Sequence, residues 1–138
     1  MSRVATHKIA TNISYAHHPA HRDNTPDKSQ WIITEYEERK CFVDARAQKW
    51  LARKIGWGLY IATGCVAYLG TARDRQRQLF VAKFVNPTQQ NLWHGYPADH
   101  QRTTNDIPTN PILKNWLNSK LLSAAKVRKL SRGQPCVL

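Results

Sequence analysis

The chain has 138 residues, and its 21 lysines and arginines outnumber nine aspartates and glutamates, which gives a formal net charge of +12. This length suits a single domain with its own core, and a hydrophobic content of 41% excludes a fully disordered chain. No apolar run approaches the roughly 20 residues of a membrane-spanning helix, so we expect no membrane association. The excess charge favours a polyanionic partner such as nucleic acid.

The positive charge is concentrated in the later part of the chain. Residues 1–41 hold six basic and five acidic side chains, whereas residues 42–138 hold fifteen basic and four acidic ones. We therefore expect a polyanion to meet the folded surface and not a basic N-terminal arm.

The first 30 residues show no helical or strand period, and His, Pro, Asn, Asp and Ser are frequent there. We predict an irregular tail over residues 1–30, ordered by a protein partner, ahead of a single basic α+β domain over residues 31–138. His17, His18 and His21 lie close together, but Pro19 interrupts any regular helix between them. No carboxylate or cysteine stands at zinc-like spacing, so we expect no metal site and no cofactor.

One amphipathic helix is predicted between Val43 and Ile55. Apolar side chains recur there at steps of three and four residues, Asp44 lies in the first turn, and Gly56 follows as a helix-ending residue. This helix would pack one face on a sheet formed by the following residues.

A strand-rich segment comes next. Its β-prone runs are Leu59–Thr63, Val66–Gly70, Leu79–Val85 and Leu92–Tyr96. Gly64 suits a tight turn, and Asn86-Pro87 ends the third run. The pattern predicts a three- or four-stranded antiparallel meander.

The C-terminal third predicts a helix pair. Asn110 and Pro111 are suited to a helix start, and Ser123 is suited to cap a second helix. The expected fold is therefore α+β, with an N-terminal tail, one amphipathic helix, a three- or four-stranded antiparallel meander and a C-terminal helix pair.

A polar and aromatic cluster follows the last predicted strand. A metal-independent ribonuclease needs a base for the ribose 2′-hydroxyl, an acid for the leaving oxygen and a cation for the phosphorane. In that hypothesis His94 is the base, His100 the acid, Arg102 the clamp, and Tyr96 orients or stacks on a nucleobase. The alternative is a purely structural loop in which these side chains satisfy turns and ion pairs.

Basic side chains fall into three patches that suit phosphate binding, because each neutralised phosphate releases counterions. Lys83 is separate, since it stands inside an otherwise apolar strand and either reaches a sheet edge or points into a polar site. The candidate nucleic-acid-binding residues are Arg46, Lys49, Arg53, Arg73, Arg75, Arg77, Lys83, Lys126, Arg128, Lys129 and Arg132. The alternative for each patch is a solvated basic surface.

The order of helix and antiparallel sheet, together with the basic charge, resembles the small bacterial ribonuclease toxins of the barnase, colicin and RelE-like group. The resemblance covers about residues 42–100 and rests on architecture, so it transfers no catalytic residue. Three functions stay open: a small basic protein that binds nucleic acid, RNA or DNA; a metal-independent ribonuclease acting as a toxin or in bacterial defence; and an interaction module for an acidic partner. Three widely spaced cysteines favour a reducing, cytoplasmic setting.

Overall fold

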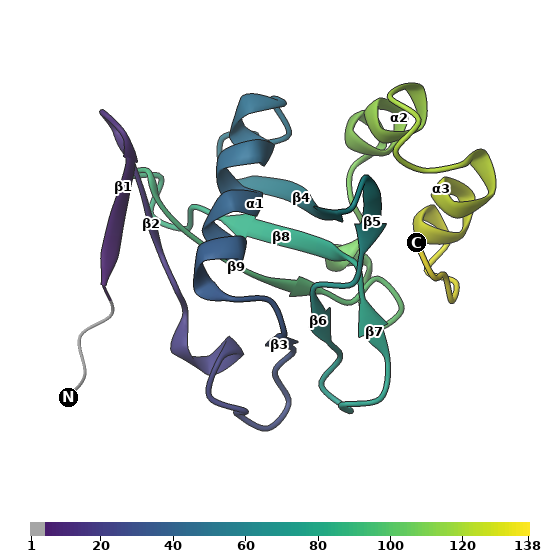
Figure 1. Cartoon of the computed structure of the whole chain (residues 1–138), viewed down its shortest axis with the longest axis horizontal. Helices are drawn as coiled ribbons and strands as arrows, with labels where there is room; N and C mark the ends of the chain where they lie inside the picture. The colour runs from purple at the N-terminus through teal and green to yellow at the C-terminus, as the bar shows by residue number, and fades with distance from the viewer. Residues whose placement is uncertain (1–4) are drawn as a thin grey trace.

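A computed structural model describes residues 5–138, whose strands form two sheets with helices packed around them (Figure 1). The strands are β1 (Thr6–Ala10), β2 (Ile13–Ala16), β3 (Gln30–Trp31), β4 (Ile55–Ala62), β5 (Cys65–Ala67), β6 (Gly70–Thr71), β7 (Gln78–Leu79), β8 (Val81–Val85) and β9 (Leu92–Ala98). The helices are α1 (Glu35–Ala47), α2 (Asn110–Asn118), α3 (Ala124–Ser131) and the 3₁₀ helices η1 (Pro19–His21) and η2 (Thr104–Asp106).

The main sheet has six strands in the order β1-β2-β9-β8-β4-β5. Adjacent strands in this sheet pair antiparallel, except that β2 and β9 run parallel and align Tyr15 with Trp93. A small sheet of β3, β6 and β7 lies below the main one in Figure 1. Because β2 joins β9, the N-terminal segment becomes an integral part of the sheet.

Helix α1 begins at a reciprocal capping box. The Thr34 hydroxyl accepts a hydrogen bond from the Glu37 backbone N–H, and the Glu37 carboxylate accepts one from the Thr34 N–H. Three glutamates in the first turn complement the helix dipole. The helix ends at Ala47, and Lys49 then adopts a positive φ of 63° that turns the chain away.

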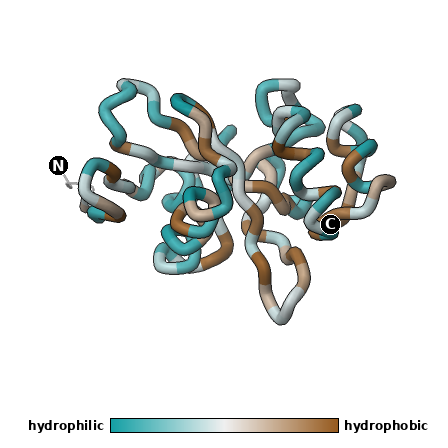
Figure 2. The backbone as a smooth tube through the Cα atoms, turned by 90° about the horizontal axis from the view of Figure 1, so that it is seen from above, coloured by the Kyte–Doolittle hydropathy of each residue, from teal (hydrophilic) through white to brown (hydrophobic). Residues whose placement is uncertain are grey.

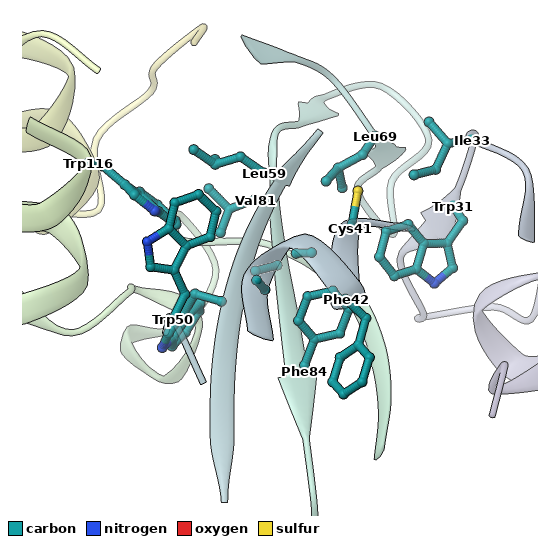
Figure 3. Packing of buried hydrophobic residues seen from close by; sticks show 14 of the residues in the cluster. Trp31, Ile33, Cys41, Phe42, Trp50, Leu59, Leu69, Val81, Phe84 and Trp116 are labelled. Carbon is teal, nitrogen blue, oxygen red and sulfur yellow. The ribbon is translucent and has the colours of Figure 1, made fainter. Parts of the chain in front are cut away.

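One half of the core lies between α1 and the sheet. Phe42 of α1 and Phe84 of β8 are fully buried, with ring centroids 5.2 Å apart, and Figure 3 shows them on the same side of the sheet. Gly58 and Gly95 stand on the strands that flank β8, where a Cβ atom would lie 2.8 Å and 2.5 Å from the Phe84 ring. Glycine at these two positions makes room for the ring.

The other half of the core lies on the opposite face of the sheet, at the end that the helix pair covers. Trp116 of α2 meets Trp50 edge to face, and the Trp50 indole N–H donates to Asn115 Oδ1 at 2.9 Å. Leu59 and Val81 lie on this side of the strands in Figure 3. Figure 2 shows hydrophobic and hydrophilic stretches alternating along the chain near its C-terminus, as expected for helices that bury one face.

The expected fold is wrong in several respects, although the α+β class is seen. The sheet has six strands and a parallel pair in place of a three- or four-stranded antiparallel meander. The amphipathic helix spans 35–47 and not 43–55, because the capping box at Thr34 starts it earlier and Trp50 belongs to the turn that follows. Residues 5–30 are no irregular tail, since they contribute β1, β2, η1 and the first residue of β3. The division of the chain into domains at residue 30 stays a prediction.

Contacts within the chain itself hold this N-terminal segment, and the protein partner expected to order it stays a prediction. The carboxylate of the fully buried Glu38 on α1 accepts hydrogen bonds from the Tyr15 hydroxyl at 2.5 Å and from Arg22 Nη2 at 2.7 Å.

Within residues 5–138, no helix combines the length and the apolar composition needed to cross a bilayer.

Candidate functional site

A cleft of about 890 Å³ opens on the sheet face opposite α1. Lys83 and Tyr96 are cross-strand partners there, and they alternate with Phe84 and Gly95, which face the helix. The loop after β9, the loop before β3 and the β6–β7 turn form its walls. Its lining residues are His21, Asp27, Lys28, Ser29, Ile55, Arg73, Lys83, Tyr96, Pro97, Asp99, Arg102, Thr103, Asn105 and Asp106.

A buried lysine forms the floor. The Lys83 side chain is 8% exposed, and its Nζ lies 5.5 Å from the Trp57 ring centroid and 5.9 Å from that of Tyr96. The ammonium donates to the carbonyl oxygen of Asn105 at 2.6 Å and lies 3.7 Å from Asp106 Oδ1. These contacts compensate the cost of placing a charge inside an apolar strand. Of the two positions that the sequence left open for Lys83, a sheet edge or a polar site, the position in the structure agrees with the polar site.

Asp106 connects the floor to the loop after β9. Its Oδ1 accepts a hydrogen bond from the Tyr96 hydroxyl at 2.8 Å, and its Oδ2 accepts one from the Asp99 backbone N–H at 2.9 Å. Burial, followed by the negative charge of Asp106, raises the pKa of Tyr96, so the phenol stays protonated and donates. This network fixes the Tyr96 ring between β8 and the residues of η1.

Three cations stand on the rim of the cleft without partners. Lys28, Arg73 and Arg102 are exposed, and none of their side-chain nitrogens hydrogen-bonds to another of the residues 5–138. Arg77 differs, because its Nη1 and Nη2 donate to the two oxygens of the buried Asp99 at 2.7 Å and 2.5 Å. The rim therefore offers unpaired positive charge, whereas Arg77 is already neutralised.

The rim is held in shape by a different arginine. Arg75 donates from Nε to Asn24 Oδ1 at 2.7 Å, from Nη1 to the Lys28 carbonyl at 2.6 Å and from Nη2 to the Thr25 carbonyl at 3.0 Å. It thus joins the loop before β3 to the turn between β6 and β7. This role leaves few of its donors for a phosphate.

Imidazoles gather at the end of the cleft where η1 meets β9. The His21 ring stacks on Tyr96, and the ring centroids of His18 lie 5.5 Å from His21 and 5.4 Å from His94. Of the three, only His21 belongs to the cleft lining. Burial lowers the pKa of both His21 and His94. Both imidazoles are therefore uncharged at pH 7 and able to accept a proton.

The proposed catalytic residues lie in different places. Tyr96 and Arg102 line the cleft, and His94 is two residues before Tyr96 on the same face of β9, next to His18. His100 points elsewhere, because its Nε2 contacts the carbonyl oxygen of Gln134 at 2.6 Å. The four residues therefore do not meet in one constellation.

The other basic patches lie outside the cleft lining. None of their members belongs to its lining, and Lys126 donates to the Leu138 carbonyl oxygen at 2.7 Å. These residues are Arg46, Lys49, Arg53, Lys126, Arg128, Lys129 and Arg132. Their binding of phosphates stays a prediction, as does that of Arg73, Arg75, Arg77 and Lys83.

Sequence reasoning did not include His21, Lys28, Asp99 or Asp106 among the candidate site residues. Both His21 and Lys28 stand in residues 1–30, for which an irregular tail was predicted, and His21 was considered there only as a metal ligand. A signal existed there: Ile13 and Tyr15 alternate with polar residues after the turn-forming Thr11-Asn12, a strand pattern. The roles of the aspartates depend on partners brought together by the fold.

Comparison of the chain with protein-family models, with curated proteins and with solved structures finds no match in any of the three. The architectural resemblance to small ribonuclease toxins gains no support from that comparison. Among residues 5–138, no three His, Cys, Asp or Glu side chains are placed to hold a metal ion together.

Proposed function

We propose that this chain is a small basic nucleic-acid-binding protein that holds the phosphates of an unpaired strand in the cleft. The observation that carries the proposal is the set of rim cations Lys28, Arg73 and Arg102, unpaired among the described residues, around the buried ammonium of Lys83. Unpaired surface cations gain most from a phosphate, because no existing ion pair has to break.

The shape of the cleft favours a single strand over a duplex. Its volume of about 890 Å³ lies in the range of pockets that enclose small ligands, about 300–1,000 Å³. A few nucleotides of an unpaired strand fit such a space, whereas a duplex presents a much wider surface. The half-buried His21 ring, stacked on Tyr96, supplies an aromatic surface for stacking by a nucleobase.

The test is the binding of labelled single-stranded RNA and DNA of about ten nucleotides, followed by fluorescence anisotropy. The double variant Arg73→Gln/Arg102→Gln is expected to weaken binding by about tenfold or more. It is also expected to lower the slope of log affinity against log salt by about one to two, since two phosphate contacts are lost. The matched control Arg128→Gln/Arg132→Gln removes the same charge from α3, outside the cleft.

Two results would overturn the proposal. One is equal binding by the Arg73→Gln/Arg102→Gln variant and the wild-type protein at about 50 mM and 200 mM salt. The other is a larger loss in the α3 variant, which would assign the interface to the C-terminal helix instead. Retention of an acidic protein at high salt, with no nucleic-acid binding, would support the interaction-module hypothesis.

We also propose the cellular compartment in which this protein acts. The cysteines Cys41, Cys65 and Cys136 are all free thiols. Free thiols are usual in reducing compartments, so we place the protein in the cytoplasm, where nucleic acid is accessible to it.

A further inference from the structure

His21 is the one imidazole of the cleft lining, and the structure presets which of its nitrogens is basic. Its Nδ1 lies 2.8 Å from the carbonyl oxygen of Ser29, and a carbonyl only accepts, so Nδ1 carries the proton. Nε2 then holds the free lone pair. Among the hydrogen bonds within residues 5–138, none uses this nitrogen.

The ring is also held in position. It stacks on Tyr96 with the centroids 5.1 Å apart and the planes at 16°, while His18 meets it edge to face at 5.5 Å. Tyr96 in turn is fixed by its hydrogen bond to Asp106. A base held by a backbone carbonyl and an aromatic ring loses little freedom when a substrate binds.

The charged surroundings favour the neutral form of this imidazole. Burial lowers the pKa of His21 first, and the nearby groups His18, Lys28 and His94 lower it further, against the opposing effect of the Ser29 carbonyl. Tyr96, which stacks on the His21 ring, stays protonated and uncharged. His21 is therefore ready to accept a proton at neutral pH.

We propose that the cleft cleaves RNA, with Nε2 of His21 as the base that takes the proton from a ribose 2′-hydroxyl. This inference rests on the proposed function, because the rim cations must first hold the strand. The 2′ oxygen attacks the adjacent phosphorus, so a P–O2′ bond forms and the P–O5′ bond breaks. The proton held by His21 passes through solvent in the open cleft to the leaving 5′ oxygen. The products are a 2′,3′-cyclic phosphate and a free 5′-hydroxyl.

The charge that develops on the phosphoryl oxygens is met by cations of this chain. Arg102 and Arg73 reach the phosphate from the rim, and the Lys83 ammonium lies below it on the floor. Fixed positive charge in a partly enclosed site stabilises such a transition state more than it stabilises the bound strand. DNA lacks the 2′-hydroxyl, so DNA binds in the same cleft without being cut.

This assignment differs from the one based on sequence, in which His94 and His100 were base and acid. His94 lies beside His18 and outside the cleft lining, and His100 contacts Gln134. The two hypotheses therefore predict opposite outcomes for single-histidine variants.

The test is single-turnover cleavage of an RNA of about ten nucleotides in EDTA, with mass analysis of the products. The variant His21→Gln is expected to slow cleavage by about 10²- to 10⁴-fold, the usual effect of removing a general base. His94→Gln and His100→Gln are expected to cleave at rates near that of the wild type. His7→Gln is the matched control, since His7 lies on the edge strand β1.

Binding is measured separately, on an all-deoxy strand that cannot react. We expect His21→Gln to weaken binding of this strand by no more than about tenfold, because one stacking surface is lost while the rim cations remain. Cleavage measured at saturating protein then separates loss of the base from loss of the site. If the wild-type protein does not bind the deoxy strand, the proposed function fails. If it binds the deoxy strand and leaves RNA intact, the binding proposal stands and the cleavage proposal is overturned.

Two further measurements leave the protein unchanged and so do not depend on how His21→Gln folds. A single 2′-deoxy substitution should abolish cleavage at that linkage alone. The wild-type rate should rise with pH as His21 loses its proton. It should reach its plateau before the pH passes about 6.5, the ordinary pKa of histidine. Cleavage of DNA, or a rate that is lost in His94→Gln and kept in His21→Gln, would overturn the assignment.

Discussion

The imidazole of His21 lies parallel to the phenol ring of Tyr96, with the ring centroids 5.1 Å apart. The first residue belongs to η1 and the second to β9, so this stack joins the N-terminal segment to the centre of the sheet. The Ser29 hydroxyl adds a second link, donating to the Pro97 carbonyl at 2.8 Å. The cleft therefore exists only when residues 13–31 are packed against β9.

The hydroxyl of Tyr96 is expected to contribute to stability through Asp106. Tyr96→Phe keeps the stack on His21 and removes the 2.8 Å hydrogen bond to a buried carboxylate, at a cost of about 1–3 kcal/mol. Urea denaturation measures this loss. Tyr68→Phe is the matched control, because the Tyr68 hydroxyl has no hydrogen bond to a described residue and the ring is 40% exposed. Equal stability of the two variants would show that the Asp106 contact contributes nothing.

The buried carboxylate of Glu38 is expected to be the most sensitive single position outside the apolar core. It lies between the Tyr15 hydroxyl, the Arg22 guanidinium and His17 Nδ1, the last at 2.9 Å. Glu38→Gln keeps the shape but leaves Arg22 without its counter-charge. We expect a loss of about 2–4 kcal/mol, less than for a fully enclosed pair because Arg22 is 21% exposed.

The control for this variant is Glu35→Gln, which changes an exposed carboxylate in the first turn of the same helix. It should lower the free energy of unfolding by less than about 1 kcal/mol, the usual value of a dipole contact. If both substitutions cost the same, the Glu38 network is not a structural link between β2 and α1. Chemical denaturation of the two variants side by side decides between these outcomes.

Local signals in the sequence predicted parts of the fold, and long-range pairing escaped them. Pro111 and Ser123 coincide with the starts of α2 and α3, because caps and proline at a first turn act within a few residues. The start of α1 was missed although Thr34 and Glu37 have capping-box spacing, since the apolar period from Val43 onward dominated. Trp50 belongs to that period but packs on Trp116, far along the chain.

The cleft was predictable only in part, because most of its residues are brought together by long-range pairing and not by local signals. Lys83 was recognisable as a charge inside an apolar strand, a pattern visible in five consecutive residues. His21 was not, because its orientation is set by the Ser29 carbonyl and the Tyr96 ring, which come from separate segments. The parallel pairing of β2 with β9 brings these segments together, and no local period encodes it.

The three thiols are expected to react in a defined order. Cys65 is exposed on β5, and Cys136 is partly buried. Cys41 is one of the buried residues of α1 itself, and burial raises its pKa to about 12. Because the thiolate is the reactive form, Cys41 should react with an aromatic disulfide reagent only when the protein unfolds. Mass spectrometry after timed labelling at about pH 8 should find Cys65 modified first and Cys136 second. Cys65→Ser should remove the fastest phase, and early labelling of Cys41 would contradict its burial.

Stability is expected to fall as the pH drops below the ordinary histidine pKa of about 6.5. Burial lowers the pKa of His21 and His94 in the folded chain, so between the folded and unfolded pKa values the unfolded chain binds more protons. The free energy of unfolding therefore rises with pH through this window and levels off above it. Urea midpoints measured between about pH 5.2 and 7.5 test the effect, since carboxylates titrate mainly below that range. His94→Gln should flatten the curve in part and His21→Gln/His94→Gln should flatten it further, because each removes a group that takes up a proton on unfolding. An unchanged slope in the double variant would show that these two imidazoles do not titrate with unfolding.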